Sequence, residues 1–137
     1  MEAKGERMNR LKIKPLSNNE MWQGQRFKTK MYEKFRDAIT HLLPKRKLPK
    51  IPAKTKLFAH YRWGFSSSLS DIDNPVKPLQ DAIFERMPND DRDVYFTILE
   101  KHIVPKGKEF IDYHIGNRDD LITHLEALLE HLKGETK

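Results

Sequence analysis

The chain has 137 residues and no cysteine, so its length fits one domain with its own core, and disulfide bonds and thiolate metal sites are excluded. Charged residues make up 34% of the sequence, the formal net charge is +6 and the pI is near 9.5, a balance that favours an acidic partner such as nucleic acid. No apolar run reaches the length of a membrane span and the first residues lack the apolar segment of a signal peptide, so we expect a cytoplasmic protein without a membrane partner.

The charge is divided unevenly along the chain. Residues 1–70 contain 17 Lys and Arg against 5 Asp and Glu, a net charge of +12, whereas residues 71–137 contain 9 against 15, a net charge of −6. A basic half joined to an acidic half predicts one surface that binds a polyanion and another that binds a metal ion. A generic solvated basic face is the alternative that charge alone leaves open.

The first part of the chain predicts a strand and a loop. Leu11 and Ile13 alternate with lysines and indicate a short, half-buried strand over residues 8–14. Proline and polar residues from Pro15 onward predict a loop that ends before the first helix. Trp22 lies in this loop with basic residues close by, so its ring either stacks on a DNA base or covers the edge of the core.

A helix is predicted over residues 30–43, where Pro44 follows and ends it. Its apolar side chains recur at helical spacing and should form one buried stripe, which consists of Met31, Phe35, Ala38, Ile39 and Leu42.

Residues 44–56 form a basic segment with six cations, three prolines and no acidic residue. Proline removes backbone donors and resists both helix and central strand, so we expect an exposed arm. The arm either holds the phosphates of DNA or acts as a solubilising loop, and the concentration of a single charge sign favours the first. The predicted DNA-contacting residues of the chain are Arg26, Lys28, Lys45, Arg46, Lys47, Lys50, Lys54 and Lys56.

The middle of the chain predicts a strand and a second helix. Residues 56–63 alternate in the manner of a strand. Asn74 is a good N-cap and Pro75 suits the first helical position, so a helix should begin there and extend to Met87. Its expected buried stripe consists of Val76, Leu79, Ile83 and Met87.

The last third of the chain predicts two strands and a helix. Residues 94–103 are mostly apolar and indicate a strand buried on both faces, and a turn joins it to a strand over residues 109–115 as an antiparallel hairpin. A final helix is expected over residues 118–132, capped by Asn117 and ended by Gly134. Its wide leucine stripe either packs on the core or forms a dimer interface.

Three aspartates flank the second helix and suggest a metal site. Asp71 and Asp73 precede the helix and face the same way if their segment is extended, and Asp91 follows the helix in a turn. Carboxylates brought together repel one another, whereas Mg²⁺ prefers carboxylate oxygens and supports phosphodiester hydrolysis. Lys77 beside them is suited to stabilise the charge of the reacting phosphate. The alternative is that the aspartates only form turns and cap helices.

These motifs resemble those of a known family. Asp71–Asn74 with Lys77 and Asp81, followed by Asn89–Val94, resembles the signature of RusA-type Holliday junction resolvases. The segment Pro15–Asn19 is similar to the N-terminal segment of that family, and the similarity extends from Lys12 to Ile115. The chain departs from the family pattern at Asp93, where glutamine is usual, in the basic arm and in the terminal helix.

The resemblance implies an α+β fold, a mixed sheet with helices packed against it, in a single domain over residues 1–137. It implies a homodimeric endonuclease that depends on Mg²⁺, with Mn²⁺ as a substitute, and resolves four-way junctions or other branched DNA in recombination and repair. Its cell would be bacterial or phage-infected. The implied catalytic residues are Asp71, Asp73, Lys77 and Asp91; the implied metal ligands are the three aspartates, with Asp90 as a further candidate.

Two other classes of function stay open at this point. A protein that binds branched DNA without cutting it would keep the same fold and the same basic half. An interaction module would use the acidic stretch only to cap helices, and it would show no metal affinity at the aspartates.

Overall fold

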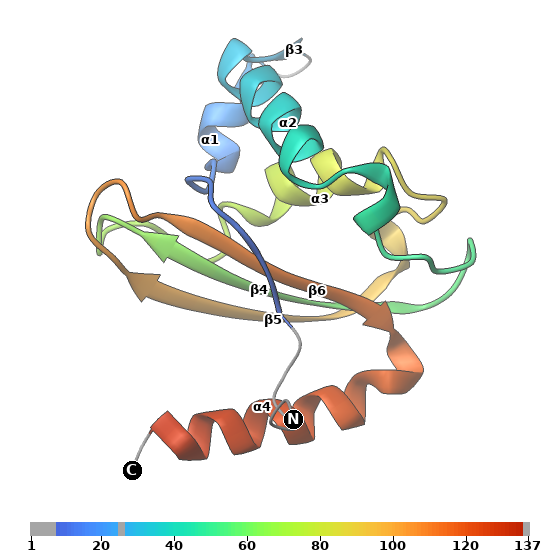
Figure 1. Ribbon diagram of the computed structural model, residues 1–137. Coiled ribbons are helices and arrows are strands. Elements are labelled where there is room, and N and C mark those ends of the chain that lie inside the picture. The colour runs from blue at the N-terminus through green and yellow to red at the C-terminus, as the bar shows by residue number, and fades with distance from the viewer. Residues whose placement is uncertain (1–7, 25–26, 136–137) are drawn as a thin grey trace.

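The computed structural model describes residues 8–24 and 27–135. They form an α+β fold in which a four-stranded mixed sheet carries helices on both faces, so the predicted fold class is confirmed. Figure 1 shows α1, α2 and α3 together on one face of the sheet and α4 on the opposite face. In chain order the helices are α1 (Asn18–Met21), α2 (Lys30–Leu42), α3 (Val76–Phe84) and α4 (Leu121–Glu135).

The sheet has the strand order β1-β6-β4-β5. Its strands are β1 (Asn9–Leu11), β4 (Leu57–Phe65), β5 (Val94–Ile103) and β6 (Phe110–Asn117). β4 pairs parallel with β5 and antiparallel with β6, and β1 pairs antiparallel with β6. The predicted hairpin between β5 and β6 is therefore wrong: the turn exists, with Lys108 N donating to Pro105 O, but it carries the chain past β4, which lies between the two strands.

Strand β4 is buried on both faces. Leu57, Ala59, Tyr61 and Trp63 are inaccessible to solvent and belong to the main core, which α2 and α3 cover. Phe58 and His60 point to the opposite face and are also fully buried, with the ring of Phe58 5.0 Å from that of His124 on α4. The strand was expected here, and its complete burial follows from helices that cover both faces.

Strand β5 has the predicted bounds but not the predicted burial. It lies at the edge of the sheet, with β4 as its partner among the described strands. Tyr95, Phe96 and Ile103 are 62%, 41% and 52% exposed. An apolar sequence indicates a buried strand only when other elements cover it, and here none of the described helices covers these three side chains.

The predicted loop before α2 contains structure of its own. Ser17 and Glu20 form a capping box that begins α1, and a small hairpin of β2 (Trp22–Gln23) and β3 (Phe27–Lys28) follows. Trp22 packs against the core and its Nε1 donates to Asn18 Oδ1 at 3.2 Å. Of the two alternatives for this ring, the structure supports the one in which it covers the core edge.

Helix α2 begins at the cap Thr29 and ends before Pro44, as predicted. Its buried face is displaced from the predicted stripe: Tyr32, Phe35 and Ile39 are buried, whereas Met31 is 51% exposed. Leu42 is also exposed and Leu43, the residue after the helix, is buried instead.

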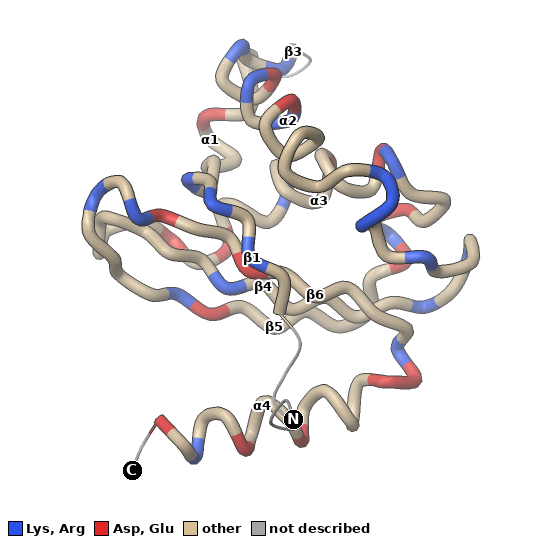
Figure 2. Tube along the Cα trace, viewed as in Figure 1, with Lys and Arg blue, Asp and Glu red and all other residues tan. Residues whose placement is uncertain are grey.

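The basic segment after α2 is not a free arm. It contains a short 3-10 helix, η1 (Lys45–Lys47), and it is held by the buried side chain of Leu48 and by a hydrogen bond from Asn89 Nδ2 to Pro52 O at 2.9 Å. All six of its cations are nonetheless exposed. Figure 2 shows the resulting basic run where the chain leaves α2.

Helix α3 is shorter than predicted, and Asn74 does not cap it. The helix begins after Pro75 without a side-chain cap, while the amide of Asn74 donates to Asp71 Oδ2 at 3.3 Å. Leu79 and Ile83 are buried as predicted.

Helix α4 is preceded by the 3-10 turn η3 (Arg118–Asp120), which Asn117 caps as predicted. The helix continues through Gly134, so the predicted stop there is wrong. Leu121 and Leu128 face the sheet and are buried. Ile122, Leu129 and Leu132, the outer part of the predicted stripe, are exposed.

A buried histidine pair joins α4 to the sheet. Nδ1 of His60 on β4 lies 2.8 Å from Nε2 of His124 on α4, and His60 Nε2 lies 2.5 Å from Glu100 Oε2. The ring of His114 stacks on His124, and Arg62 donates to Glu100. Burial, together with His114 and His60, lowers the pKa of His124 to about 4. Burial raises the pKa of Glu100, but the contacts with His60 and Arg62 outweigh it and bring that pKa to about 2.

The histidine pair predicts acid sensitivity of the fold. In the unfolded chain His124 has a pKa of about 6.5. The folded protein therefore favours neutral His124, and the stabilisation that follows is complete above about pH 6.5. We expect the free energy of unfolding to fall as the pH is lowered from about 6.5 towards 4. Urea denaturation at a series of pH values measures this free energy.

The matched variants are His124→Gln, which keeps a polar group that does not titrate, and His131→Gln on the exposed face of α4. The first should flatten the pH dependence and the second should keep it. Equal pH profiles for the two variants would contradict the role given to His124.

Candidate active site

Three side chains predicted or weighed as functional meet on the α3 side of the sheet. Lys77 Nζ lies 2.9 Å from Asp81 Oδ1 and 3.0 Å from Asp91 Oδ2, so one ammonium group bridges two carboxylates. Hydrogen bonds to Asp81 and Asp91 raise the pKa of Lys77, so the ammonium stays charged near neutral pH. Lys28 Nζ adds a second cation, 3.3 Å from Asp81 Oδ2.

Helix geometry and a capped turn position this group. Lys77 and Asp81 are four residues apart on α3 and therefore lie on one face of the helix. Asp91 begins the 3-10 turn η2 (Asp91–Asp93), directly before β5. Asp90 caps η2 by accepting from Arg92 N, and Asp93 accepts from Asp90 N, which completes a capping box.

Asp90 and Asp91 thus differ in their local contacts. The backbone N–H of Arg92 lowers the pKa of Asp90, whose carboxylate holds the turn. Asp91 extends to Lys77 across the cavity between α3 and η2, which measures about 250 Å³. The predicted metal ligand Asp91 lines this cavity, and so does Asp90, the further candidate.

Asp71 and Asp73 lie in the turn between β4 and α3. The indole Nε1 of Trp63 donates to Ile72 O at 2.6 Å and holds this turn against the core. Asp71 is exposed and lines a different cavity, of about 400 Å³, beside the Pro15–Glu20 segment. Asp73 is exposed, and its carbonyl accepts from Val76 N at the start of α3.

The structure therefore brings Lys77 to Asp81 and Asp91 but does not group the three predicted aspartates. Within residues 8–24 and 27–135, no three acidic or histidine side chains are close enough together to hold a metal ion. The chemistry of the donors still fits a hard divalent cation, because all are carboxylates and two of them already hold a cation, the Lys77 ammonium, between them.

The predicted DNA-contacting residues lie at two places. Lys28 belongs to the site itself, where its ammonium also lies 4.6 Å from the ring centroid of Tyr32. The cations of the basic segment are exposed along one side of the molecule, and Lys56 lies over the ring of Tyr95. Arg26 lies outside the described residues.

The comparison with known families decides the class of protein. Residues 12–111 match the family profile described as endodeoxyribonuclease RusA. The chain belongs to this RusA family. The family is one of DNA endonucleases, and the matched region contains the Lys77 site, both acidic motifs and the basic segment. No curated protein matches the chain.

The RusA match ends at residue 111 and so leaves out α4 and most of β6. The terminal helix with its histidine contact to β4 is thus a feature that the family match does not describe. In the part of the chain that the structure describes, no helix is long and apolar enough to cross a membrane.

Asn89 lines the cavity between α3 and η2, and its contacts could not be predicted from the sequence. It is 4% exposed, and its Nδ2 donates to Pro52 O in the basic segment. Its Oδ1 is buried and has no hydrogen-bond partner among the described residues. The available signal was its place directly before Asp90 and Asp91, in the motif that resembles the family signature.

The exposed cations of residues 44–56 predict strongly salt-dependent DNA binding. If their six charges neutralise about six phosphates, a plot of log K against log salt should have a slope of roughly −5. Replacing Lys45, Lys47 and Lys50 with Gln should reduce that slope by about 3. The control replaces Lys106, Lys108 and Lys133, far along the chain, and should leave the slope unchanged. Equal slopes for both triple variants would contradict a role of this segment in binding phosphates.

Proposed function

We propose that this RusA-family protein is a magnesium-dependent endonuclease that cuts branched DNA, such as a four-way junction, in recombination and repair. The observation that carries the proposal is the Lys77 ammonium held between Asp81 and Asp91, beside an exposed basic segment. Carboxylates that attract a cation and cations that attract phosphate are the two parts that such a reaction needs.

The metal ligands in this proposal are Asp71, Asp73 and Asp91, with Asp90 as a further ligand. A bound Mg²⁺ supplies Lewis acidity at the phosphoryl oxygen and lowers the pKa of an attacking water. Mn²⁺ prefers similar oxygen ligands and should substitute for Mg²⁺. The side chains of Asp71 and Asp73 are exposed in the turn that precedes α3.

Lys77 acts on the phosphate in this account. Its side chain is 46% exposed, so the ammonium is accessible to a strand of DNA. With Asp91 as a metal ligand, Lys77 would keep its contact with Asp81 and could donate to a phosphate oxygen, where negative charge develops. Lys28, on the other oxygen of Asp81, supports the same carboxylate.

The proposal predicts that cutting and binding can be separated. Asp91→Asn and Asp71→Asn keep the size of the side chain but remove the charge that holds a metal. Each should lower the rate of four-way junction cleavage by at least about a hundredfold, while junction affinity measured without metal stays within about threefold of wild type.

The matched control is Asp37→Asn, on the exposed face of α2. It should cut at the wild-type rate. Cleavage retained in both active-site variants would exclude a metal site at these aspartates. Tight, salt-dependent binding of junctions by a wild-type protein that cuts nothing would favour the alternative, a protein that binds branched DNA without catalysis.

We also propose that the protein forms a homodimer through the open edge of β5. This ten-residue strand has a free edge among the described strands, and Tyr95, Phe96 and Ile103 are exposed along it. Exposed strand edges with apolar side chains favour pairing with another chain. Because β5 begins directly after Asp91–Asp93, a dimer formed here carries two active sites linked to one interface, which suits paired cuts in two strands.

The dimer has a direct test. Light scattering after gel filtration should give twice the 16.2 kDa mass of one chain. Tyr95→Glu, which places a charge on the β5 edge, should shift the protein towards the monomer. Phe27→Glu is the matched control, an aromatic residue with 73% exposure in the β2–β3 hairpin, and it should stay dimeric. A monomeric wild type at micromolar concentration would contradict the dimer.

A further inference from the structure

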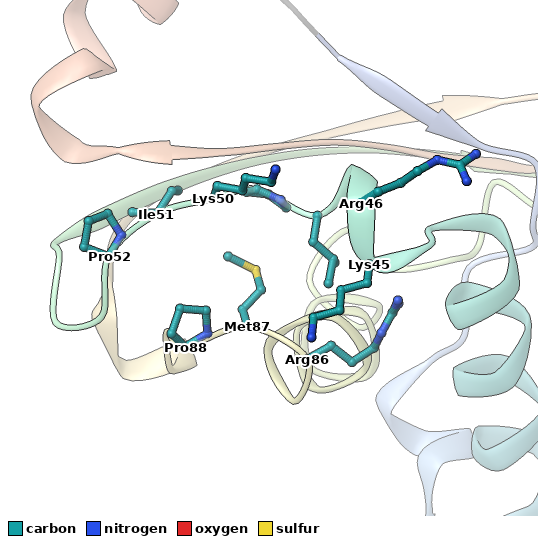
Figure 3. Close-up of a pocket in the computed structure, with 10 residues that line it drawn as sticks. Lys45, Arg46, Lys50, Ile51, Pro52, Arg86, Met87 and Pro88 are labelled. Atoms are coloured by element: carbon teal, nitrogen blue, oxygen red, sulfur yellow. The ribbon is translucent and has the colours of Figure 1, made fainter.

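A third cavity lies next to the candidate active site, between the basic segment and the end of α3. It measures about 690 Å³, a size within the range of small-ligand pockets. Its apolar walls come from Leu48, Ile51 and Pro52 on one side and from Met87 and Pro88 on the other. Figure 3 shows Met87 extending between the two sides, with Pro88 below it and Ile51 and Pro52 above.

Among the described residues, the charged side chains that line this cavity are all cations, namely Lys45, Arg46, Lys50 and Arg86. Arg86 Nη1 is buried and has no hydrogen-bond partner among the described residues. A buried guanidinium nitrogen without a partner is costly and needs an explanation, and a phosphate oxygen or a base carbonyl would supply the missing acceptor.

The cavity borders the candidate active site. Pro88 is followed directly by Asn89, which lines the Asp91 cavity. The hydrogen bond from Asn89 Nδ2 to Pro52 O ties the two walls together at this point. A ligand in the larger cavity would therefore lie beside the cavity that Asp91 lines.

We propose that this cavity binds one unstacked nucleotide of the branched DNA, with its base against Met87, Ile51 and the prolines and its phosphates on Lys45 and Arg86. The inference rests on the proposed function and names a nucleotide-binding subsite for it. An apolar slot ringed by cations is complementary to a nucleotide, which has an apolar ring face and an anionic backbone. Branch points supply such a nucleotide at low cost, because their bases are more easily unstacked than those within a duplex.

The experiment measures binding without metal, so that it does not depend on cutting. Four-way junctions are prepared in which nucleotides around the branch point are replaced, one at a time, by an abasic residue that keeps the phosphate. At one position, loss of the base should weaken binding by about tenfold, the usual effect of losing a stacked base. No position with such an effect would overturn the proposal.

Two variants connect that effect to the cavity. Ile51→Trp fills the slot, and Arg86→Met removes the unpartnered cation while keeping a similar side-chain length. In both, intact and abasic junctions should bind with affinities within about twofold of each other. Thermal unfolding shows which variants are folded. If the larger tryptophan disturbs the core, Arg86→Met alone tests the cavity. An abasic effect that persists in a folded variant would overturn the proposal.

Arg46→Met is the matched control, because the guanidinium of Arg46 extends away from Met87 and Pro88 (Figure 3). It removes the same charge from the same rim, so it should weaken binding of intact and abasic junctions equally and leave their ratio at about tenfold. Loss of the ratio in this variant as well would show a general effect of charge and contradict the assignment to the cavity.

The experiments distinguish failure of this subsite from failure of the proposed function. A protein that cuts junctions with Mg²⁺ but shows no abasic effect keeps the proposed function and loses only this subsite. A protein that binds no junction loses both. Titration with deoxyadenosine monophosphate distinguishes a free nucleotide from a nucleotide of DNA: micromolar binding that Ile51→Trp abolishes would identify the free nucleotide as the ligand and overturn the DNA assignment.

Discussion

Strand β4 is the element on which the rest of the molecule depends. It is hydrogen-bonded to β5 on one side and β6 on the other, and helices cover both of its faces. Two of its side chains also hold the segments that carry the site. Trp63 Nε1 donates to the backbone of the Asp71–Asp73 turn, and Tyr61 OH accepts from Gln80 Nε2 on α3. Burial raises the pKa of Tyr61, so its hydroxyl stays neutral where it meets α3.

The parallel pairing of β4 with β5 requires the crossover connection that carries α3 and the turns before and after it. The chain leaves β4, turns at Asp71–Asp73, returns along α3 and enters β5 through η2. A parallel strand needs such a crossover, and the crossover helix lies on one face of the sheet. Lys77 on α3 and Asp91 in η2 both belong to this crossover, and they meet across 14 positions of the sequence.

Local features of the fold could be predicted from the sequence, and non-local ones could not. The bounds of α2 and β5 follow from Thr29, Pro44 and runs of apolar residues, which act within a few positions. The order of the strands depends on which partners meet across the whole chain, so β5 and β6 were wrongly paired. The prediction that β5 is buried was wrong for the same reason, because an edge position is a property of the sheet and not of the strand.

The candidate site also has local features that could be predicted and non-local ones that could not. Lys77 and Asp81, four residues apart on α3, make a contact that this helical spacing favours, and the acidic motifs pointed to the region that the family match covers. The pair of His60 and His124 and the contact of Asn89 with Pro52 went unrecognised, because each joins segments at least 37 residues apart in the sequence. No local sequence pattern predicts such a contact. The cavity beside Met87 is likewise invisible until residues 44–56 fold back against α3.

The central claim is that this chain cuts branched DNA with a divalent metal. The most direct measurement compares cleavage of a four-way junction, a fork and a linear duplex of matched sequence, with Mg²⁺, with Mn²⁺ and with a chelator. The account predicts nicks near the branch point of the junction or the fork with either metal, and no cleavage with the chelator or of the duplex. Cleavage of the duplex at an equal rate, or no cleavage of any substrate with either metal, would contradict it.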